Sequence, residues 1–503
     1  MSGASRPLTL AVDIGTSSAR ALMYEASGRV VPGTESQIPY DVTTTPDGGV
    51  EVDARLLGGI VARCIDGALA NAPVRAAAID RVATSCFMHS LVGLDADGHA
   101  LTPVYMWGDI RAGDQVRQLR RETDMEAVRQ RTGVVLHSSY WPAKLRWLHE
   151  TQPEIVAQVR RWATFDGFLH REWLHRDAIA MPMASSTGLL DIVAGDWDAA
   201  TVALAGGARE TLPPVVPVAS TAKLAEADWR QRWPELAAVP WHPAVGDGLC
   251  ANVGSGATDP SSVALTLGTS GAVRAVVPAP LGQPFAVPPD LWAYRLDAGR
   301  MVIGAAVSNG GNVAAWLGDL LGGAVDAATW DAAAAIPPDG HGLTFLPFLS
   351  GERAPIWSDD VTAAIVGLRL STGRPQLLRG AMEAVALRLS LLYRALAPHV
   401  DPGHRIVANG GALLNSPAWQ RIVCDTLGAP LTLLPPGEEA SARGAALIAL
   451  EASGALRSYA AADDPAVGQP VLDPDPVGHA AYAAAALRQE ALEAALRGGP
   501  WWG

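Results

Sequence analysis

The chain has 503 residues and carries 51 acidic against 38 basic side chains, which gives a formal net charge of −13. This acidic balance disfavours nucleic acid and anionic membrane surfaces as partners, because proteins bind both through basic patches on their own surface. Hydrophobic residues make up 49% of the chain, so we expect a globular protein whose length divides into two large domains.

The first predicted element is a β-hairpin at residues 10–24, LAVDIGTSSARALMY. An apolar run leads into the turn Gly15-Thr16-Ser17, and a second apolar run follows it. This is the pattern of strand, glycine turn and strand. The hydroxyl and backbone N–H groups of such a turn can donate hydrogen bonds to phosphate oxygens, although a plain turn without a ligand has the same pattern.

The next segment of interest follows a predicted strand, RVATSCF, and contains Met88-His89-Ser90. A second short apolar piece leads into YMWGDIRA, which holds Trp107 and Asp109. Both segments place polar or aromatic side chains after short apolar runs, but a lone histidine is more often structural.

Asp247 lies between glycines in VGDGLCANVG, where a loop enters a predicted helix. A helix N-terminus keeps a carboxylate ionised, as a general base requires. The structural alternative is an N-cap, worth about 1 kcal/mol.

A second hairpin is predicted at residues 263–277, VALTLGTSGAVRAVV. It repeats the turn as Gly268-Thr269-Ser270, and Thr266 takes the place that Asp13 has in the first copy. Two copies, one in each half of the chain, predict two similar domains that hold one nucleotide between them. The asymmetry is chemically sensible, because one carboxylate suffices to hold Mg²⁺ through water.

The last third contains two Gly-Gly pairs, Gly310-Gly311 and Gly410-Gly411, which suit a close approach to a nucleotide. Beyond them, a Pro- and Asp-rich stretch predicts a surface loop, and AAYAAAALRQEALEAALRG predicts an alanine-rich helix. We expect the closing GGPWWG to be a frayed end, with docking of its tryptophans left open.

The compartment follows from the cysteines and from hydropathy. Four cysteines stand far apart without a CxxC pair, which predicts neither a disulfide framework nor a zinc site. No uncharged apolar stretch reaches the ~18–20 residues of a membrane span. We therefore expect a cytoplasmic protein without a membrane partner.

Six motifs, in order, resemble the FGGY carbohydrate kinases. They are DIGTSSAR, residues 85–112, GDGLCANVGSG followed by TLGTSGAVR, VIGAAVSNGGNVAAW, LPFLSGERAPIW and ANGGALLNSPAWQRIVCDTLGAPL. The resemblance implies an α/β actin-like ATPase (ribonuclease H-like) fold of two duplicated domains with a nucleotide cleft between them. The implied division is 1–250 for the N-terminal kinase domain, 251–455 for the C-terminal kinase domain and 456–503 for a loop and helix that pack on the body.

The resemblance also implies roles for individual residues, with ATP and Mg²⁺ as cofactors. Asp247 would be the catalytic base and also contact the acceptor, and Asp13 would organise Mg²⁺. The residues expected to bind the nucleotide are Thr16, Ser17, Ser18, Arg20, Gly268, Thr269, Gly310, Gly311, Gly411, Ala412 and Asn415. The residues expected to bind the acceptor are Met88, His89, Trp107 and Asp109.

The implied reaction is phosphorylation of a sugar or sugar acid. Glycerol-type members have an Arg-Glu pair where this chain has Met88-His89, which argues against glycerol. The motifs look most like those of the gluconate kinases, which make 6-phosphogluconate from D-gluconate, and Arg111, Arg274 and His89 are candidates for the carboxylate. Xylulose or another ketopentose or polyol is the alternative acceptor, and a non-catalytic actin-like nucleotide sensor is the remote one. Family members are often dimers, so a homodimer is an expectation by resemblance alone.

Overall fold

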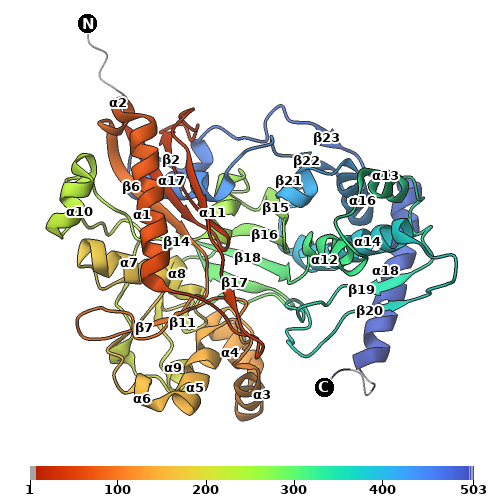
Figure 1. The fold of residues 1–503 in the computed structure, drawn as a ribbon, viewed down its shortest axis with the longest axis horizontal. Coiled ribbons are helices and arrows are strands. Elements are labelled where there is room, and N and C mark those ends of the chain that lie inside the picture. The colour runs from red at the N-terminus through yellow and green to blue at the C-terminus, as the bar shows by residue number, and fades with distance from the viewer. Residues whose placement is uncertain (1–6, 498, 500–501, 503) are drawn as a thin grey trace, which may run out of the picture.

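The computed structural model describes residues 7–497, 499 and 502. Figure 1 shows two lobes side by side along the longest axis, with the red-to-yellow half of the chain in one and most of the green-to-blue half in the other. Each lobe is built on its own mixed β-sheet with helices on its faces.

The sheet of the first lobe has the strand order β14-β6-β1-β2-β3. Its strands are β1 (Leu8–Ile14), β2 (Ser18–Glu25), β3 (Ser36–Pro39), β6 (Ile79–Cys86) and β14 (Val245–Gly246). The first predicted hairpin is confirmed, because β1 pairs antiparallel with β2. β6 returns parallel to β1 and places Ser85 beside Asp13 in the register. β1 is buried along its whole length, as expected of a central strand with neighbours on both sides.

The sheet of the second lobe has the order β17-β18-β16-β15-β21-β22-β23. Its strands are β15 (Ser262–Leu267), β16 (Gly271–Pro278), β17 (Trp292–Arg295), β18 (Arg300–Val307), β21 (Arg405–Asn409), β22 (Leu431–Leu433) and β23 (Val471–Leu472). The second predicted hairpin is confirmed by the antiparallel pairing of β15 with β16. β18 then extends the antiparallel run, and β21 returns parallel to β15. Both lobes therefore repeat one plan, a three-stranded antiparallel run followed by a strand parallel to its first member.

Smaller sheets extend the body beside the first lobe and beneath the second. They are β4 (Thr43–Thr44) with β5 (Val50–Val52) and β8 (Val104–Tyr105), β7 (Val92–Leu94) with β9 (Arg161–Ala163), β10 (Ile179–Ala180) with β13 (Val215–Val216), β11 (Leu190–Asp191) with β12 (Asp196–Trp197), and β19 (Thr344–Leu346) with β20 (Ala364–Val366).

The helices of the first half pack around its main sheet and around the smaller sheets of that half. They are α1 (Ala54–Asn71), α2 (Pro73–Ala76), α3 (Gly113–Glu122), α4 (Met125–Thr132), α5 (Trp141–Thr151), α6 (Pro153–Val156), α7 (Phe165–Leu174), α8 (Met181–Ser185), α9 (Ala199–Leu204) and α10 (Ala227–Arg232). Those of the second half are α12 (Asn312–Leu320), α13 (Ala327–Ala334), α14 (Arg374–Leu396), α15 (Gly411–Leu414), α16 (Pro417–Leu427) and α18 (Pro476–Arg497).

Two further helices, α11 (Asp247–Gly254) and α17 (Ala440–Ala452), lie between the two sheets (Figure 1). α17 packs on β1 and β6 of the first sheet and crosses α11. The crossing is close because both helices have glycine at it. A Cβ atom at Gly444 would lie 1.8 Å from the carbonyl oxygen of Cys250, and one at Gly254 would lie 1.8 Å from that of Ala440.

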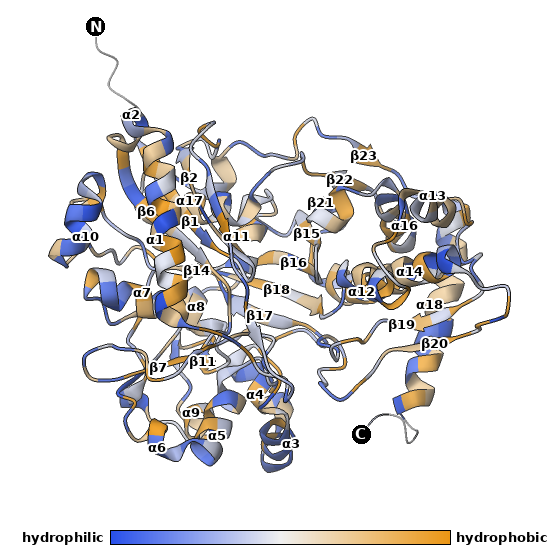
Figure 2. Ribbon diagram, viewed as in Figure 1, coloured by the Kyte–Doolittle hydropathy of each residue, from blue (hydrophilic) through white to orange (hydrophobic). Residues whose placement is uncertain are grey.

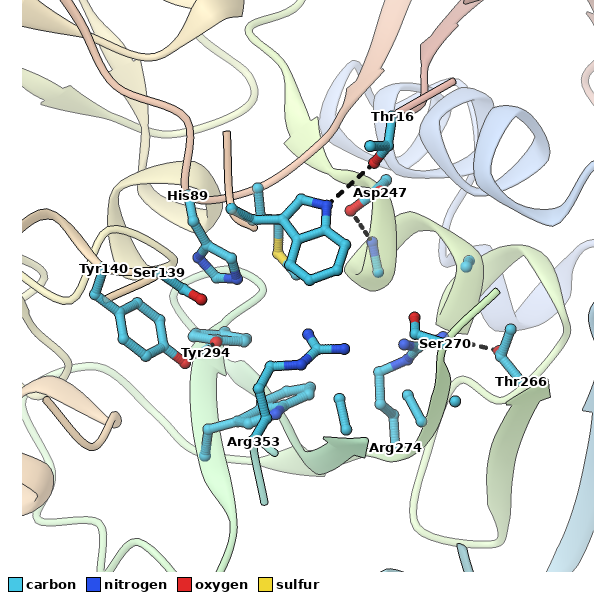
Figure 3. Close-up of a pocket in the computed structure, with 18 of the residues that line it drawn as sticks. Thr16, His89, Ser139, Tyr140, Asp247, Thr266, Ser270, Arg274, Tyr294 and Arg353 are labelled. Atoms are coloured by element: carbon cyan, nitrogen blue, oxygen red, sulfur yellow. Dashed lines mark hydrogen bonds between the residues drawn. The ribbon is translucent and has the colours of Figure 1, made fainter. Parts of the chain in front are cut away.

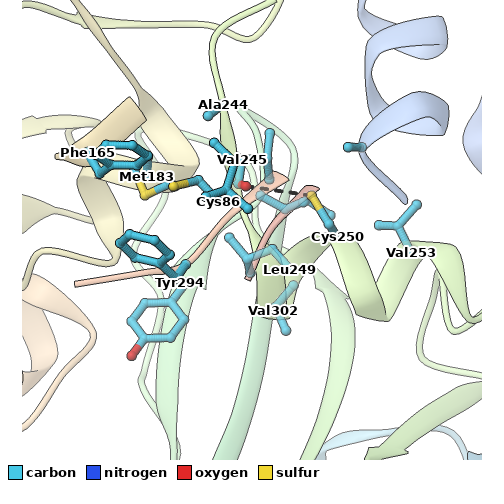
Figure 4. Packing of buried hydrophobic residues seen from close by; sticks show 14 of the residues in the cluster. Cys86, Phe165, Met183, Ala244, Val245, Leu249, Cys250, Val253, Tyr294 and Val302 are labelled. Carbon is cyan, nitrogen blue, oxygen red and sulfur yellow. Dashed lines mark hydrogen bonds between the residues drawn. The ribbon is translucent and has the colours of Figure 1, made fainter. Parts of the chain in front are cut away.

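The hydrophobic residues collect on the sheets and on the inner helix faces. Figure 2 shows this contrast, with blue residues dominating outer helices such as α3 and α10. Directly below the junction of the lobes, Cys86, Val245, Leu249 and Cys250 pack together with Val302 (Figure 4). All four cysteines of the chain are buried and unpaired, so they act as small apolar core residues.

The C-terminal segment packs on the second lobe through α18, which contacts α14, α16 and β19. Arg388 of α14 forms a buried ion pair with Glu493 at 2.5 Å. The expected frayed end is wrong for Trp502, which is buried against the ring of Phe348; Trp501 lies outside the described residues. Among the described helices none is long and apolar enough to cross a membrane.

Candidate active site

Both predicted hairpins contribute to one cavity of about 260 Å³ at the junction of the lobes. Thr16 reaches it from the first hairpin, and Thr266, Ser270 and Gly271 reach it from the second (Figure 3). In each turn the glycine N–H donates to a backbone carbonyl across the turn, Gly15 to Ser18 at 3.0 Å and Gly268 to Ser270 at 2.9 Å, so the second turn is one residue tighter.

Asp247 is the first residue of α11 and faces this cavity. Its Oδ1 accepts a hydrogen bond from the backbone N–H of Gly248 at 2.7 Å. Burial raises the pKa of the carboxyl above its ordinary value, while the Gly248 N–H and the charges of Arg274 and Arg353 oppose that rise. An elevated pKa makes the carboxylate a stronger base, which suits proton abstraction from a hydroxyl.

Asp13 lies near the end of β1 and is 5% exposed. Its Oδ1 is buried and has no hydrogen-bond partner in the described part of the chain. Burial raises the pKa of Asp13 to about 6, and the neighbouring charge of Asp247 adds to the increase. An uncompensated carboxylate oxygen of this kind is suited to hold a hard cation such as Mg²⁺ directly or through water.

His89 and Met88 both line the cavity. His89 has a left-handed backbone, with φ of 67°. Its Nδ1 lies 2.5 Å from the carbonyl oxygen of Ser186, so Nδ1 carries the proton and Nε2 is left as an acceptor. Burial lowers the pKa of His89 to about 3, which makes the ring neutral and removes it from the candidates for binding a carboxylate as a cation.

Trp107 also lines the cavity, and its Nε1–H donates to Thr16 Oγ1 at 3.2 Å. Asp109, two residues later, does not reach the cavity. Its carboxylate accepts hydrogen bonds from the guanidinium of Arg111 and from Val50 N–H, the latter at 3.3 Å. Arg111 is further engaged by Glu51 at 2.6 Å. The two side chains neutralise each other below the cavity, so neither is free to meet an acceptor.

Arg353 is a cavity residue that the sequence analysis did not single out, although it lies in the quoted motif SGERAPIW. Its Nη2 donates to the Val307 carbonyl at 2.9 Å, and its guanidinium lies 4.9 Å from the centre of the Trp107 ring. Its Nε is buried without a partner among the described residues. Figure 3 shows the guanidinium pointing into the space between His89 and Asp247.

Arg274 of β16 is the second cation of the cavity. Its Nη2 donates to Thr266 Oγ1 at 3.0 Å, and its Nε has no partner in the described chain. Burial lowers the pKa of Arg274 to about 10, with Asp247 opposing the decrease, so the group remains charged at neutral pH.

The remaining walls come from residues that local sequence patterns could not connect. Tyr140 and Tyr294 share a hydrogen bond between their hydroxyls at 2.6 Å, and the edge of the His89 ring meets Tyr140. Ser139, Trp292 and Trp357 complete this end of the cavity. No local sequence pattern marks Tyr294 or Trp292, because both lie on the edge strand β17 and reach the site only through pairing with β18.

A second cavity, of about 720 Å³, opens in the second lobe. It contains four of the residues expected to bind the nucleotide: Gly311, Gly411, Ala412 and Asn415. Small side chains such as Ala314 and Ala315, together with the rings of Trp330 and Trp419, line the rest. Gly410 just outside it has φ of 100°, and a Cβ there would lie 2.4 Å from the Leu267 carbonyl oxygen, so this turn requires glycine.

Two family models match almost the whole chain. The N-terminal domain of the FGGY family of carbohydrate kinases matches residues 8–254, and the C-terminal domain matches residues 263–453. This chain belongs to the FGGY family. It is an ATP-dependent carbohydrate kinase with the two-domain, actin-like fold of that family.

This FGGY kinase has relatives with different acceptors. It is 27% identical over 474 residues to a gluconokinase of Bacillus subtilis (strain 168), an alignment that covers 90% of this chain and 89% of the relative. It is 29% identical over 464 residues to a glycerol kinase of Gloeobacter violaceus, with 90% and 89% covered. The solved gluconate kinase of Lactobacillus acidophilus superposes with a TM-score of 0.87 at 24% identity, covering 98% of this chain and 99% of that one.

Several of the residues expected to bind the nucleotide line neither cavity of the FGGY kinase. Ser18 Oγ donates a hydrogen bond to the side-chain oxygen of Gln37, and Arg20 forms an ion pair with Glu439. Gly268, Thr269 and Gly310 also lie outside both cavities. Gly310 N–H donates to the Thr269 carbonyl at 3.0 Å, and N–H of Gly311, which lines the second cavity, donates to the Gly268 carbonyl at 2.7 Å. These backbone bonds join the second hairpin to the loop between the cavities. Ser17 is exposed at the tip of the first hairpin.

Proposed function

We propose that this kinase transfers the γ-phosphoryl group of ATP to a hydroxyl of D-gluconate. The observation that carries the proposal is the charge of the acceptor cavity. The Nε–H groups of Arg274 and Arg353 are buried there without an acceptor among the described residues, while Asp247 lines the cavity and Glu352 lies beside Arg353 outside it. Buried N–H donors without an acceptor are costly, so the site is suited to bind more negative charge than a neutral sugar brings.

The positions of the two arginines suggest different partners for them. Arg274 lies beside Asp247 and Thr266, next to the second hairpin, where the transferred phosphoryl group would arrive. Arg353 lies near Trp107 and the Tyr140–Tyr294 pair, farther from Ser270 and Thr266 of the second hairpin than Arg274 is (Figure 3). We assign Arg353 to the carboxylate of the acceptor, because guanidinium binds carboxylate in a charge-assisted pair.

Phosphoryl transfer then depends on positioning and electrostatic stabilisation, with little covalent chemistry for the protein itself. Asp247 accepts the proton of the acceptor hydroxyl as the oxygen–phosphorus bond forms, and the bond between the γ-phosphorus and the bridging oxygen breaks to leave ADP. Nε2 of His89 accepts a hydrogen bond from another hydroxyl. Mg²⁺, when bound at Asp13, would neutralise phosphate charge. Adenosine fits the cavity beside Gly411 and Asn415, whose walls are small and apolar.

The test is ADP release from ATP and Mg²⁺ with D-gluconate, D-xylulose, L-ribulose, glycerol and erythritol, each with the purified protein. We expect turnover on gluconate and little on the neutral compounds. Turnover on a ketopentose or polyol in place of gluconate would contradict the acceptor assignment. No turnover on any of them would exclude every acceptor in the set, gluconate included.

A further inference from the structure

Lys144, one of the two lysines of the chain, lies beneath the acceptor cavity without lining it. It belongs to α5 and is 1% exposed. Its Nζ donates hydrogen bonds to the carbonyl oxygen of His89 at 3.0 Å and to that of Met106 at 2.7 Å. No carboxylate of the described residues forms an ion pair with it, and the nearby Asp109 is already held by Arg111.

The two carbonyls belong to the two segments that present acceptor-facing side chains. His89 follows strand β6, and Met106 immediately precedes Trp107. The segments lie side by side near their bases, since Leu91 and Tyr105 exchange backbone hydrogen bonds at 2.9 and 3.0 Å. Lys144 spans the same two segments where they enter the cavity, so its ammonium sets the separation between His89 and Trp107.

The backbone of His89 adds a second observation. A non-glycine residue with φ of 67° is strained and persists only when its surroundings hold it, at a cost of roughly 1–3 kcal/mol. The ring is held through Ser186 and the carbonyl through Lys144. An apolar side chain could fill the space under the loops, but it could not hold the two carbonyls.

We propose that Lys144 is a positioning residue for the acceptor: it fixes His89 and Trp107 at the spacing that binds the sugar, without touching the sugar itself. The proposal rests on the proposed function only in taking this cavity as the acceptor site, and does not depend on which acceptor it is. Burial lowers the pKa of Lys144 to about 7, yet a neutral amine still has enough N–H groups for both carbonyls.

The test compares Lys144→Met with Lys223→Met, which removes the other, exposed lysine. The acceptor is whichever compound the wild-type enzyme turns over. We expect Lys144→Met to raise the KM for the acceptor about 10- to 100-fold, as when a hydrogen-bonding group fails to hold a buried partner. The KM for ATP should stay within about twofold, and Lys223→Met should match the wild type.

Two results would overturn the proposal: an unchanged acceptor KM in Lys144→Met, or an equal rise in the KM for ATP, which marks a general loss of structure. If Lys144→Met does not fold, Lys144→Arg decides. Its fixed, planar donors reproduce the charge but not the spacing, so the acceptor KM should rise and the ATP KM should not. Wild-type turnover on a neutral sugar would refute the gluconate proposal and leave this test in force.

Discussion

Asp247 is the residue on which the proposed chemistry depends most. Replacing it with asparagine keeps the shape and the hydrogen bond to Gly248 but removes the base. We expect kcat to fall by about 10²–10⁴, with ATP binding retained, because Asp247 faces the first cavity and not the second, in which we propose that adenosine binds. Steady-state ADP release and nucleotide titration measure the two quantities. Near-full activity in Asp247→Asn would show that another group takes the proton.

We expect the buried carboxylate of Asp13 to lower the stability of the fold, although the proposed reaction requires it. Its pKa is raised from 3.8 to about 6 in the folded protein, so between these pH values the native state holds a proton that the unfolded state has lost. The free energy of unfolding therefore falls as pH rises through this window. At pH 7.5 and without Mg²⁺, Asp13→Asn should increase the free energy of unfolding by up to about 3 kcal/mol and thereby raise the melting temperature. The same variant should abolish turnover.

The same comparison at pH 3 is the control, because pH 3 lies below both pKa values, so the folded and unfolded wild type are then largely protonated at this position and most of the gain should vanish. If Asp13→Asn were less stable than the wild type at pH 7.5, the buried carboxylate would not lower the free energy of unfolding, which would contradict this prediction.

At the residue scale, the sequence predicted those cavity residues whose position depends only on their own short segment. Thr16, Met88, His89, Trp107 and Asp247 line the first cavity, because each follows directly on a strand or a turn that the sequence marks. It misplaced Asp109, which lies two residues from Trp107 but points to Arg111. Whether a turn residue faces a cavity depends on partners far away in the sequence, here Glu51 and Val50, which no local pattern reveals.

At the scale of elements, the crossing of α11 and α17 fixes the position of the proposed base, because Asp247 is the first residue of α11. Gly444→Ala would place a methyl group 1.8 Å from the Cys250 carbonyl and force the helices apart. We expect a loss of roughly 1–3 kcal/mol or more in stability together with a lower kcat. Thermal unfolding and ADP release measure the two effects.

The matched control is Gly59→Ala in α1, where a Cβ meets nothing within 4 Å and helix propensity favours alanine by about 1 kcal/mol. Wild-type stability and kcat in Gly444→Ala would show that the two helices are free to separate.

The hairpins were predictable from sequence because each is a local unit of two strands and a glycine turn. The two β17 residues that line the first cavity, Trp292 and Tyr294, could not be predicted from sequence. Their side chains enter the cavity only through the antiparallel pairing of β17 with β18. The duplication of the whole β-sheet plan could be inferred only from the repeat of one turn, which marks the equivalent strands β1 and β15.

At the scale of the whole molecule, contacts between the lobes close the rim of the acceptor cavity. His137 Nε2 lies 3.1 Å from Asp359 Oδ1, and Arg120 donates to the Trp357 carbonyl at 2.5 Å. Trp357 itself lines the cavity. These contacts hold the loop of the second lobe over the acceptor end and would exclude water once substrates are bound.

Asp359→Asn should therefore raise the acceptor KM several-fold and increase ADP release in the absence of acceptor. Asp360→Asn is the matched control, because the Arg117–Asp360 pair is exposed and such pairs are worth about 0.2–1 kcal/mol. Equal behaviour of both variants would mean that the rim contact does not control access.

The ratio of kcat/KM for D-gluconate to kcat/KM for D-glucitol tests most directly whether the acceptor is a sugar acid. D-glucitol has an alcohol in place of the carboxylate. If the guanidinium of Arg353, whose buried Nε–H has no acceptor among the described residues, binds that carboxylate, gluconate should be preferred by a factor on the order of 100 or more, and Arg353→Gln should remove most of the preference. A ratio near one in the wild-type enzyme would contradict an acid-specific acceptor site.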